Sequence, residues 1–275
     1  MPLDIETHGL TRYFDDFCAV DHVDLRVERG TLYGFLGPNG AGKSTTIKML
    51  TGLLAPTSGD ILLLGRNPAN PSEAIEVKRH IGVVPEDLAL FDNLTSREYL
   101  TFVGRMYLLP RDTIRQRIDE LLPLLRLQDD AKKLVLEFSH GMKKKLALAA
   151  ALLPNPNLLF LDEPFEGVDA VTSRVIRDLL SDYVSRGSTV FLTSHVLEIV
   201  ERLCTHVGII AEGKLVEQAS LEEIRMGNSL EDRFLEKVGS ADDAHQKLSW
   251  LDGAPLDDRP ARLGGIDANS EETSA

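Results

Sequence analysis

The chain has 275 residues, of which 43% are hydrophobic, and a formal net charge of −13. This length suits one compact domain with a subsidiary lobe, and the apolar content suffices for a buried core. The acidic balance argues against a nucleic-acid-binding surface and against a polybasic membrane anchor, because both need clustered lysine and arginine.

The cysteine content and the hydropathy indicate a cytoplasmic protein. Cys18 and Cys204 are too few for a disulfide framework and wrongly spaced for zinc. We interpret them as small buried hydrophobes in a reducing compartment. No apolar run approaches the ~18 residues of a membrane-spanning helix, and no signal-peptide pattern is expected at the N-terminus. Work at a membrane would therefore require a second protein.

The N-terminal region predicts antiparallel strands. Residues 3–36 alternate short apolar stretches with polar turns, and Val23, Leu25 and Val27 recur with a period of two. Tyr13 lies near the start of this region. Its spacing is compatible with two interpretations: a core side chain, or an aromatic ring that stacks on adenine. The apolar run at residues 31–36 predicts a buried strand.

A glycine-rich loop with the pattern GxxxxGK[ST] follows that strand. It spans residues 37–45 and consists of Gly37, Pro38, Asn39, Gly40, Ala41, Gly42, Lys43, Ser44 and Thr45. Glycines in such a loop let backbone amides surround phosphate groups. We assign Lys43 to the β- and γ-phosphates, Ser44 to Mg²⁺, and the amides of Gly40, Gly42, Lys43 and Ser44 to the phosphate oxygens.

A helix is predicted directly after this loop. Its apolar side carries Ile47, Leu50, Leu53 and Leu54, and it ends near residues 52–56. The order of strand, loop and helix is the context that a phosphate-binding loop requires. The sequence therefore predicts a nucleotide site.

The middle of the chain predicts more strands and then a helical insertion. Residues 61–64 and 81–84 are strand candidates separated by a short helix at 73–79, which indicates a mostly parallel sheet. Glu86 follows the second of these strands. Helical spacing then continues from 88 to about 128, and another helix is predicted over 142–152. We interpret residues 88–154 as a helical subdomain inserted between two strands.

Two apolar faces define the insertion. The first carries Tyr99, Phe102, Val103 and Met106, and the second, after Pro110, carries Ile114, Ile118, Leu121, Leu122 and Leu125. The helix at 142–152 follows Ser139-His140-Gly141 and has three lysines, 143–145, in its predicted first turn.

Two later strands end in residues with chemical function. The apolar run at 158–161 ends at Asp162 and Glu163, and the run at 189–193 ends at Ser194 and His195, with a helix from Val196. The carboxyl ends of parallel strands meet at one edge of a sheet, where such folds bind ligands. We expect these side chains beside the glycine-rich loop.

The C-terminal region predicts a hairpin, two helices and a tail. Residues 207–211 and 214–218 are the hairpin strands, and 221–226 and 230–238 are short amphipathic helices. Residues 238–275 are polar and acidic, which predicts a mostly disordered tail.

This ordered series of motifs resembles the ATP-binding subunit of ABC transporters, most of all the subunits that serve separately encoded permeases of the ABC-2 export type. The resemblance covers about residues 1–237. It implies an α/β P-loop NTPase fold: an ABC-type ATPase core with an antiparallel β subdomain and a helical subdomain. It also implies ATP and Mg²⁺ as ligands, and ATP hydrolysis coupled to transport.

The same resemblance implies partners and a location. The partners are an integral membrane permease and a second cassette, either identical or similar, in a head-to-tail dimer with two ATP molecules at the interface. The location is the cytoplasmic face of the membrane, as a peripheral subunit. Residues 88–109 are the predicted docking surface for the permease, because this insertion lies near Glu86.

Roles at the ATP site follow from the same resemblance. Tyr13 would stack on adenine, Glu163 would polarise the attacking water, and His195 would contact the γ-phosphate. The metal residues would be Ser44, Glu86 and, through water, Asp162.

Three residues would act on the ATP bound by the other subunit. These are Ser139, Gly141 and Asp169. The chain departs from the family pattern around them, with Phe-Ser-His-Gly-Met at 138–142 in place of LSGGQ, and with Glu166 and Val168 in place of serine and leucine before Asp169. Glu86 also replaces the usual glutamine. Hydrolysis is still expected, because the catalytic and phosphate-binding residues are present.

Two other classes fit the glycine-rich loop less well. Soluble ABC-type ATPases that act on ribosomes or DNA typically carry two cassettes or a long coiled coil, and this chain has one loop motif and no sustained heptads. A GTPase or small-molecule kinase would leave His195 unexplained, and the chain lacks an Asn-Lys-x-Asp string for base recognition.

Overall fold

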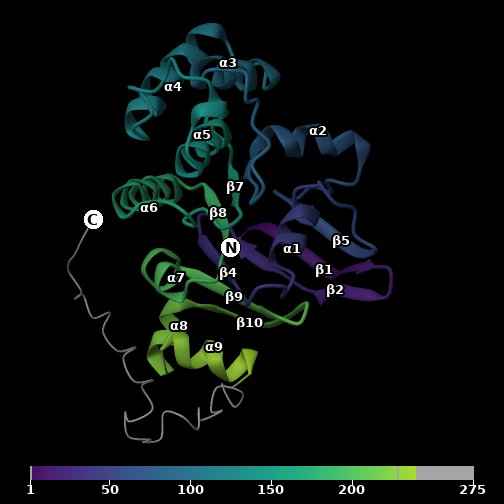
Figure 1. Cartoon of the computed structure of the whole chain (residues 1–275). Coiled ribbons are helices and arrows are strands. Elements are labelled where there is room, and N and C mark those ends of the chain that lie inside the picture. The colour runs from purple at the N-terminus through teal and green to yellow at the C-terminus, as the bar shows by residue number, and fades with distance from the viewer. Residues whose placement is uncertain (1, 228, 240–275) are drawn as a thin grey trace, which may run out of the picture. The chain divides into compact units, whose positions relative to one another are not determined.

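The computed structural model describes residues 2–227 and 229–239, and the acidic tail predicted beyond them lies outside the described residues. Its larger sheet has the strand order β10-β9-β4-β8-β7-β6 (Figure 1). The strands are β4 (Leu32–Leu36), β6 (Ile81–Val84), β7 (Leu158–Leu161), β8 (Thr189–Ser194), β9 (His206–Ala211) and β10 (Lys214–Ser220). All neighbours pair in parallel except β10, which forms an antiparallel hairpin with β9.

The central strands are buried on both faces. Every residue of β4 and β7 is buried, which explains why these strands are continuous apolar runs without alternation. On one face, Phe35, Phe160 and Phe191 pack together in a core shared with the antiparallel sheet. On the other face, Leu36 and Leu161 belong to a core shared with the later helices. The sheet is therefore the middle layer of the fold.

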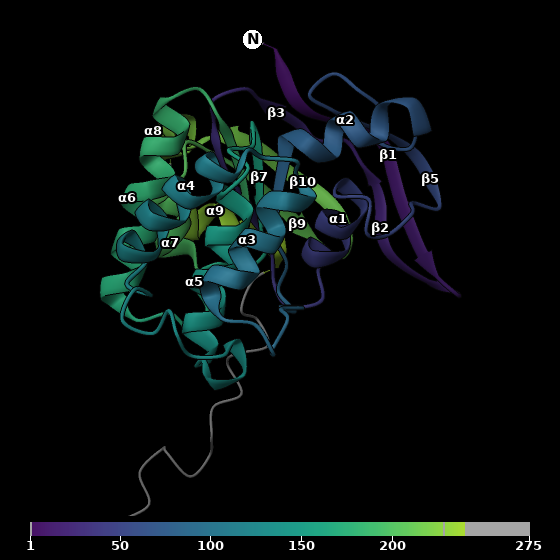
Figure 2. The same cartoon turned by 90° about the horizontal axis from the view of Figure 1, so that it is seen from above.

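The second sheet is antiparallel and lies beside the first. It consists of β1 (Leu3–Phe14), β2 (Phe17–Val23), β3 (Arg26–Glu28) and β5 (Ser58–Leu63), with β1 paired to the other three. Helices α1 (Lys43–Leu50) and α2 (Pro71–His80) accompany it. Figure 2 shows β1, β2 and β5 at one side of the described unit and α4 and α6 at the other.

The chain between β6 and β7 is helical, as the sequence indicates. It contains α3 (Ser96–Met106), α4 (Arg111–Leu124), the short 3-10 helix η1 (Val135–Glu137) and α5 (His140–Leu152). The second apolar face is buried at Ile114, Ile118 and Leu122. The first apolar face is only partly buried, because Phe102 and Met106 are exposed whereas the neighbouring Leu100 and Gly104 are buried.

Several boundaries differ from the expectations. Helix α5 begins at His140, two residues before its predicted start at residue 142. Ser139 caps it there by accepting a hydrogen bond from the Met142 amide. Helix α1 ends at Leu50, so Leu53 lies outside it and is exposed. Helix α6 (Ala170–Ser185), whose start is capped by Asp169, was not predicted from the sequence. Its core-facing side carries the buried Ile176 and Leu180, and the partly buried Leu179, Tyr183 and Val184 pack against the same core.

The C-terminal elements agree closely with the expectations. They are α7 (Leu197–Leu203), the β9-β10 hairpin, α8 (Leu221–Gly227) and α9 (Leu230–Val238). None of the helices in the described part of the chain is both long enough and apolar enough to cross a membrane.

Candidate nucleotide-binding and catalytic site

The glycine-rich loop connects β4 to α1 in a shape that only glycine allows at two positions. A Cβ atom at Gly37 would lie 2.4 Å from the carbonyl oxygen of Ile210. Gly42 has a φ of +106°, and a Cβ there would lie 2.5 Å from the carbonyl oxygen of Ala19. Gly42 is also the N-cap of α1 and has no side chain to bond the first amides, which leaves these amides to an anion.

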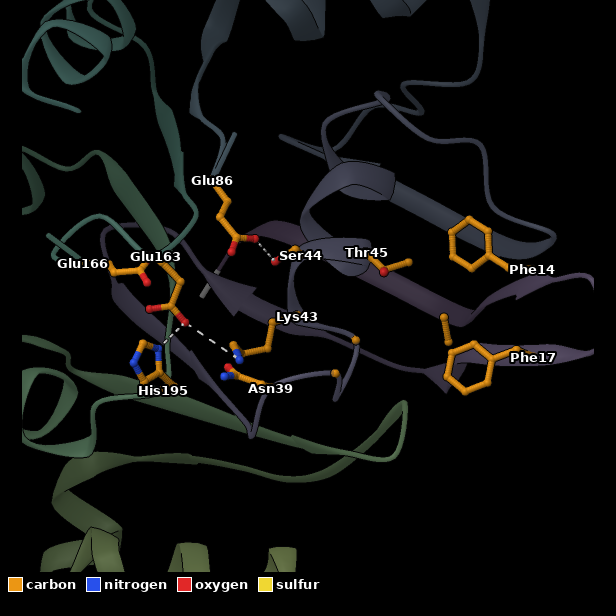
Figure 3. Close-up of a pocket in the computed structure, with 13 residues that line it drawn as sticks. Phe14, Phe17, Asn39, Lys43, Ser44, Thr45, Glu86, Glu163, Glu166 and His195 are labelled. Atoms are coloured by element: carbon orange, nitrogen blue, oxygen red, sulfur yellow. Dashed lines mark hydrogen bonds and ion pairs between the residues drawn. The ribbon is translucent and has the colours of Figure 1, made fainter. Parts of the chain in front are cut away.

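A cavity of about 470 Å³ lies against this loop (Figure 3). Its lining comes from three places: the loop and the start of α1 (Asn39, Gly40, Gly42, Lys43, Ser44 and Thr45), the antiparallel sheet (Phe14, Phe17 and Ala19), and the segments after parallel strands (Glu86, Glu163, Glu166 and His195). The parallel sheet gathers these last side chains, because β6, β7 and β8 all end at the edge where β4 enters the loop.

Lys43 lies inside the loop. Its ammonium donates to the carbonyl oxygens of Gly37 at 2.8 Å and Pro38 at 3.2 Å, and Nζ is 3.8 Å from Oε1 of Glu163. The side chain is almost fully buried, with 7% of it exposed. A cation held between a phosphate-binding loop and a carboxylate can neutralise phosphate charge at this position.

The three residues predicted to hold Mg²⁺ converge. Oγ of Ser44 lies 3.1 Å from Oε2 of Glu86 and 3.2 Å from Oδ1 of Asp162. Oδ1 of Asp162 also accepts a 2.6 Å bond from Thr193 Oγ1, whereas its Oδ2 is buried and has no hydrogen-bond partner among the described residues. Burial raises the pKa of Asp162.

The oxygen atoms of Ser44, Glu86 and Asp162 suit Mg²⁺ only together with those of a phosphate. The described residues contain no group of three or more His, Cys, Asp and Glu side chains arranged as a metal site. A hydroxyl, two carboxylates and phosphate oxygens are nonetheless the hard ligands that Mg²⁺ takes in nucleotide sites. The orphaned Oδ2 of Asp162 is a buried acceptor that a metal-bound water could satisfy.

Glu163 and His195, the two residues predicted to be catalytic, lie in contact in the cavity. Nδ1 of His195 is 3.0 Å from Oε1 of Glu163, whose side chain is 10% exposed. The backbone amide of Glu163 donates to Thr193 Oγ1 at 3.0 Å, so one threonine orients both Asp162 and Glu163. Glu163 has a φ of +46°, a left-handed conformation that costs a non-glycine residue about 1–2 kcal/mol. The surrounding contacts hold the carboxylate in this strained position.

The aromatic side of the cavity bears on the prediction that Tyr13 stacks on adenine. Phe14 and Phe17 line the cavity and face each other across the β1-β2 pair, but Tyr13 does not line it. Successive side chains of a strand point to opposite faces, so a shift of one residue moves the ring from one side of β1 to the other. The pairing of β1 with β2 is irregular between Arg12 and Tyr13, so period-two alternation in the sequence could not have separated the two rings.

The residues predicted to act on the other subunit's ATP lie outside this cavity. Ser139 caps α5, and Asp169 caps α6 by accepting bonds from the amides of Val171 at 3.0 Å and Thr172 at 2.9 Å. Gly141 lies in the first turn of α5. Within one chain these three do not line the cavity at the loop, and their role toward a second ATP stays a prediction.

Comparison with known proteins identifies the family. The model of the ABC transporter family matches residues 20–166. The chain belongs to the ABC transporter family. The bacitracin transport ATP-binding protein BcrA of Bacillus licheniformis is 42% identical over 225 residues, which cover 82% of this chain and 72% of that protein. The daunorubicin resistance ATP-binding protein DrrA3 of Streptomyces coeruleorubidus is 34% identical, with coverage of 95% and 86%.

The fold comparison agrees. A solved structure described as the ATP binding subunit of an ABC transporter superposes with a TM-score of 0.80 at 30% identity, covering 86% of this chain and 100% of that one. This confirms the predicted ABC ATPase fold. The cassette is an ATP-binding subunit of an ABC transporter and an ATPase that drives transport, and the ribosome- or DNA-directed alternative is not favoured.

Proposed function

We propose that the cassette binds MgATP in the cavity at residues 37–45 and hydrolyses it with Glu163 as general base. One observation carries the catalytic assignment: the buried Glu163 carboxylate is within 3.0 Å of His195 and 3.8 Å of Lys43 at the mouth of the phosphate loop. Phosphoryl transfer depends on positioning and charge neutralisation, and these groups supply both. The carboxylate polarises the attacking water, and His195 orients the carboxylate and contacts the γ-phosphate.

Mg²⁺ would be held by Ser44, with Glu86 and Asp162 as further oxygen ligands or partners of its waters. When bound, it neutralises charge on the β- and γ-phosphates. The cassette's own residues prepare that position: Thr193 orients Asp162, and Ser44 lies between the two carboxylates. Glu86 brings a negative charge where the family usually has an amide, which we expect to strengthen the dependence of ATP binding on the metal.

The adenine ring would stack on Phe14 rather than on Tyr13. Phe14 lines the cavity and also has the guanidinium of Arg12 4.6 Å from its ring centroid. We expect Phe14→Ala to weaken ATP binding by about 10-fold, since stacking on an aromatic ring contributes ~1–3 kcal/mol per base. Titration with a fluorescent ATP analogue measures this. Tyr13→Ala is the matched control, and an equal loss in that variant would restore the original assignment.

The cassette would act as a dimer, identical or paired with a similar cassette. Ser139 and the amide of Gly141 lie at the N-terminus of α5, where helix amides favour an anion. They do not line their own chain's cavity, so their phosphate would be one bound by a second subunit. Asp169 would lie at the same interface.

A separately encoded membrane permease would be the second partner, which places the cassette peripherally on the cytoplasmic face of the membrane. A largely apolar groove of about 400 Å³ lies between α3 and the end of α1 and is lined by Leu53, Leu88, Leu90, Tyr99 and Val103, among others. Pro85, next to Glu86, also lines it, so an inserted permease segment would touch the loop that reaches the metal position.

Exposed residues of α3 beside this groove provide a test. Phe102 and Met106 are 42% and 66% exposed. We expect Phe102→Glu with Met106→Glu to abolish transport while ATP binding by the purified cassette stays at the parent value. Arg115→Glu on the neighbouring α4 is the matched surface control. Loss of ATP binding in the double variant would instead show that α3 supports the nucleotide site.

The direction of transport would be export. BcrA is named for bacitracin transport and DrrA3 for daunorubicin resistance, and both resemble this cassette over most of its length. The decisive experiment isolates the Glu163→Gln cassette with ATP from gently solubilised native membranes and identifies its partners by mass spectrometry. A stoichiometric multi-span membrane protein supports the proposal, and ribosomal proteins or nucleic acid without a membrane protein would replace it with the soluble class.

A further inference from the structure

One buried lysine has no role in the mechanism above. Lys144 lies on α5 with only 3% of its side chain exposed. Its ammonium donates to the backbone carbonyl oxygens of Glu163 at 2.8 Å and Glu166 at 2.7 Å, and Nζ is 3.7 Å from Oε2 of Glu166. All of its nearby acceptors therefore belong to the turn that carries the catalytic carboxylate.

The contacts of Lys144 are specific rather than a general salt bridge. Burial lowers the pKa of its ammonium, and the carboxylates of Glu166 and Glu163 act against this. A buried ammonium is retained only where its donors are satisfied, and two carbonyl oxygens and one carboxylate do that here. The adjacent Lys143 is different: its side chain is 27% exposed and lies 3.1 Å from Asp92, outside this turn.

The turn that Lys144 contacts is the strained one. Glu163 has a φ of +46°, and its carbonyl oxygen also receives a long 3.3 Å bond from the Glu166 amide. A local bond of this length is weak, so the charge-assisted bonds from Lys144 are the stronger restraint on the turn.

A second contact joins the same two segments. A Cβ atom built on Gly167 would lie 3.1 Å from Cδ2 of His140, so the imidazole ring rests against the glycine of this turn. His140 stands where the family pattern in the segment at 138–142 has its first glycine. Helix α5 is thus attached to residues 163–167 at two points, one turn apart on the helix.

We propose that Lys144 is a positioning residue that holds the backbone of Glu163 in its catalytic conformation and connects it to α5, the helix that Ser139 caps. This rests on the proposed role of Glu163. Because Ser139 is proposed to meet ATP bound by a second subunit, one lysine would tie the catalytic carboxylate of one ATP site to the contact made with the other. Glu166 completes this arrangement as the carboxylate partner of the lysine.

The test compares Lys144→Met, which removes the donors at similar length, with Lys144→Arg, which keeps the charge, and with Lys143→Met as the control. ATP turnover by the purified full-length cassette gives kcat and KM, and hydrogen exchange of the peptide covering 162–169 is measured without nucleotide. In Lys144→Met we expect kcat to fall by about 10-fold with KM within about 2-fold of the parent, and exchange to rise by about 10-fold. Lys144→Arg should restore much of both values, and Lys143→Met should match the parent.

Lys144→Gln is measured beside these variants, because its polar side chain keeps the buried site occupied if the methionine variant does not fold. Parent-like kcat and exchange in both Lys144→Met and Lys144→Gln would overturn the proposal. Equal effects in Lys143→Met would overturn it too, since the loss would not be specific to the buried contact. Glu163→Gln distinguishes failure of this proposal from failure of the proposed function. If Glu163→Gln hydrolyses ATP at the parent rate, the proposed role of Glu163 fails. If Glu163→Gln loses hydrolysis while Lys144→Met is unaffected, only the positioning role of Lys144 fails.

Discussion

Replacing Glu163 by glutamine is expected to leave ATP binding intact and to slow ATP hydrolysis by about 100-fold or more, the range for a positioned general base. Glutamine has the same size and can keep the contact with His195, which lies 3.0 Å from Oε1. The neutral amide cannot accept a proton from the attacking water. Phosphate release measures turnover, and titration with ATP in the presence of Mg²⁺ measures binding.

The control for this experiment is an exposed glutamate close in sequence to His195. Glu198 lies on α7 with 69% of its side chain exposed, and its carboxylate pairs with Arg202 instead of with the cavity. Glu198→Gln should hydrolyse ATP at the parent rate. A Glu163→Gln variant that also keeps the parent rate would remove Glu163 from the general-base role.

The second large effect is expected from Lys43→Ala, which should weaken ATP binding by about 10- to 100-fold, the size of one or two lost charge-assisted bonds. The ammonium is the cation within the phosphate loop, and its removal also leaves Glu163 with no cation at 3.8 Å. A carboxylate without that partner repels the triphosphate, so binding and turnover should fall together.

Lys48→Ala is the matched control for Lys43→Ala, because Lys48 lies on the same helix and does not line the cavity. Circular dichroism should show both variants folded, since the loop shape depends on Gly37 and Gly42 rather than on the lysine. Unchanged ATP affinity in Lys43→Ala would show that the phosphates lie elsewhere.

Most of the fold could be predicted from local patterns. The strands at 81–84 and 158–161 coincide with β6 and β7, because a strand buried on both faces is an unbroken apolar run. Helix α6 was missed although the sequence carries two signals for it: the capping Asp169, and apolar residues at helical spacing from Ile176 to Val184 that pack on the core. The exposed positions of Phe102 and Met106 could not be derived either, because apolar spacing does not show which side of a stripe is covered.

The candidate site, too, could be predicted from the sequence only in part. The phosphate loop, Asp162, Glu163 and His195 were expected at one sheet edge, and the structure brings them there together with Glu86. The sequence assigned adenine stacking to Tyr13, whereas the neighbouring Phe14 is the ring that lines the cavity. Lys144 stood in a run of three lysines that the sequence could not tell apart, and only packing distinguishes it from Lys143.

The sequence by itself determined the family, the phosphate loop and the order of strand-end carboxylates, because these depend on backbone freedom at glycine and on apolar runs, both of which are local properties. The tertiary structure alone decided which ring lines the cavity and which of the three lysines contacts the turn at Glu163. Those outcomes depend on contacts between residues far apart in the chain, such as the bond from Lys144 to the Glu163 carbonyl across 19 positions. Side-chain burial is settled by the packing of whole elements, and a pattern of neighbouring residues does not contain that information.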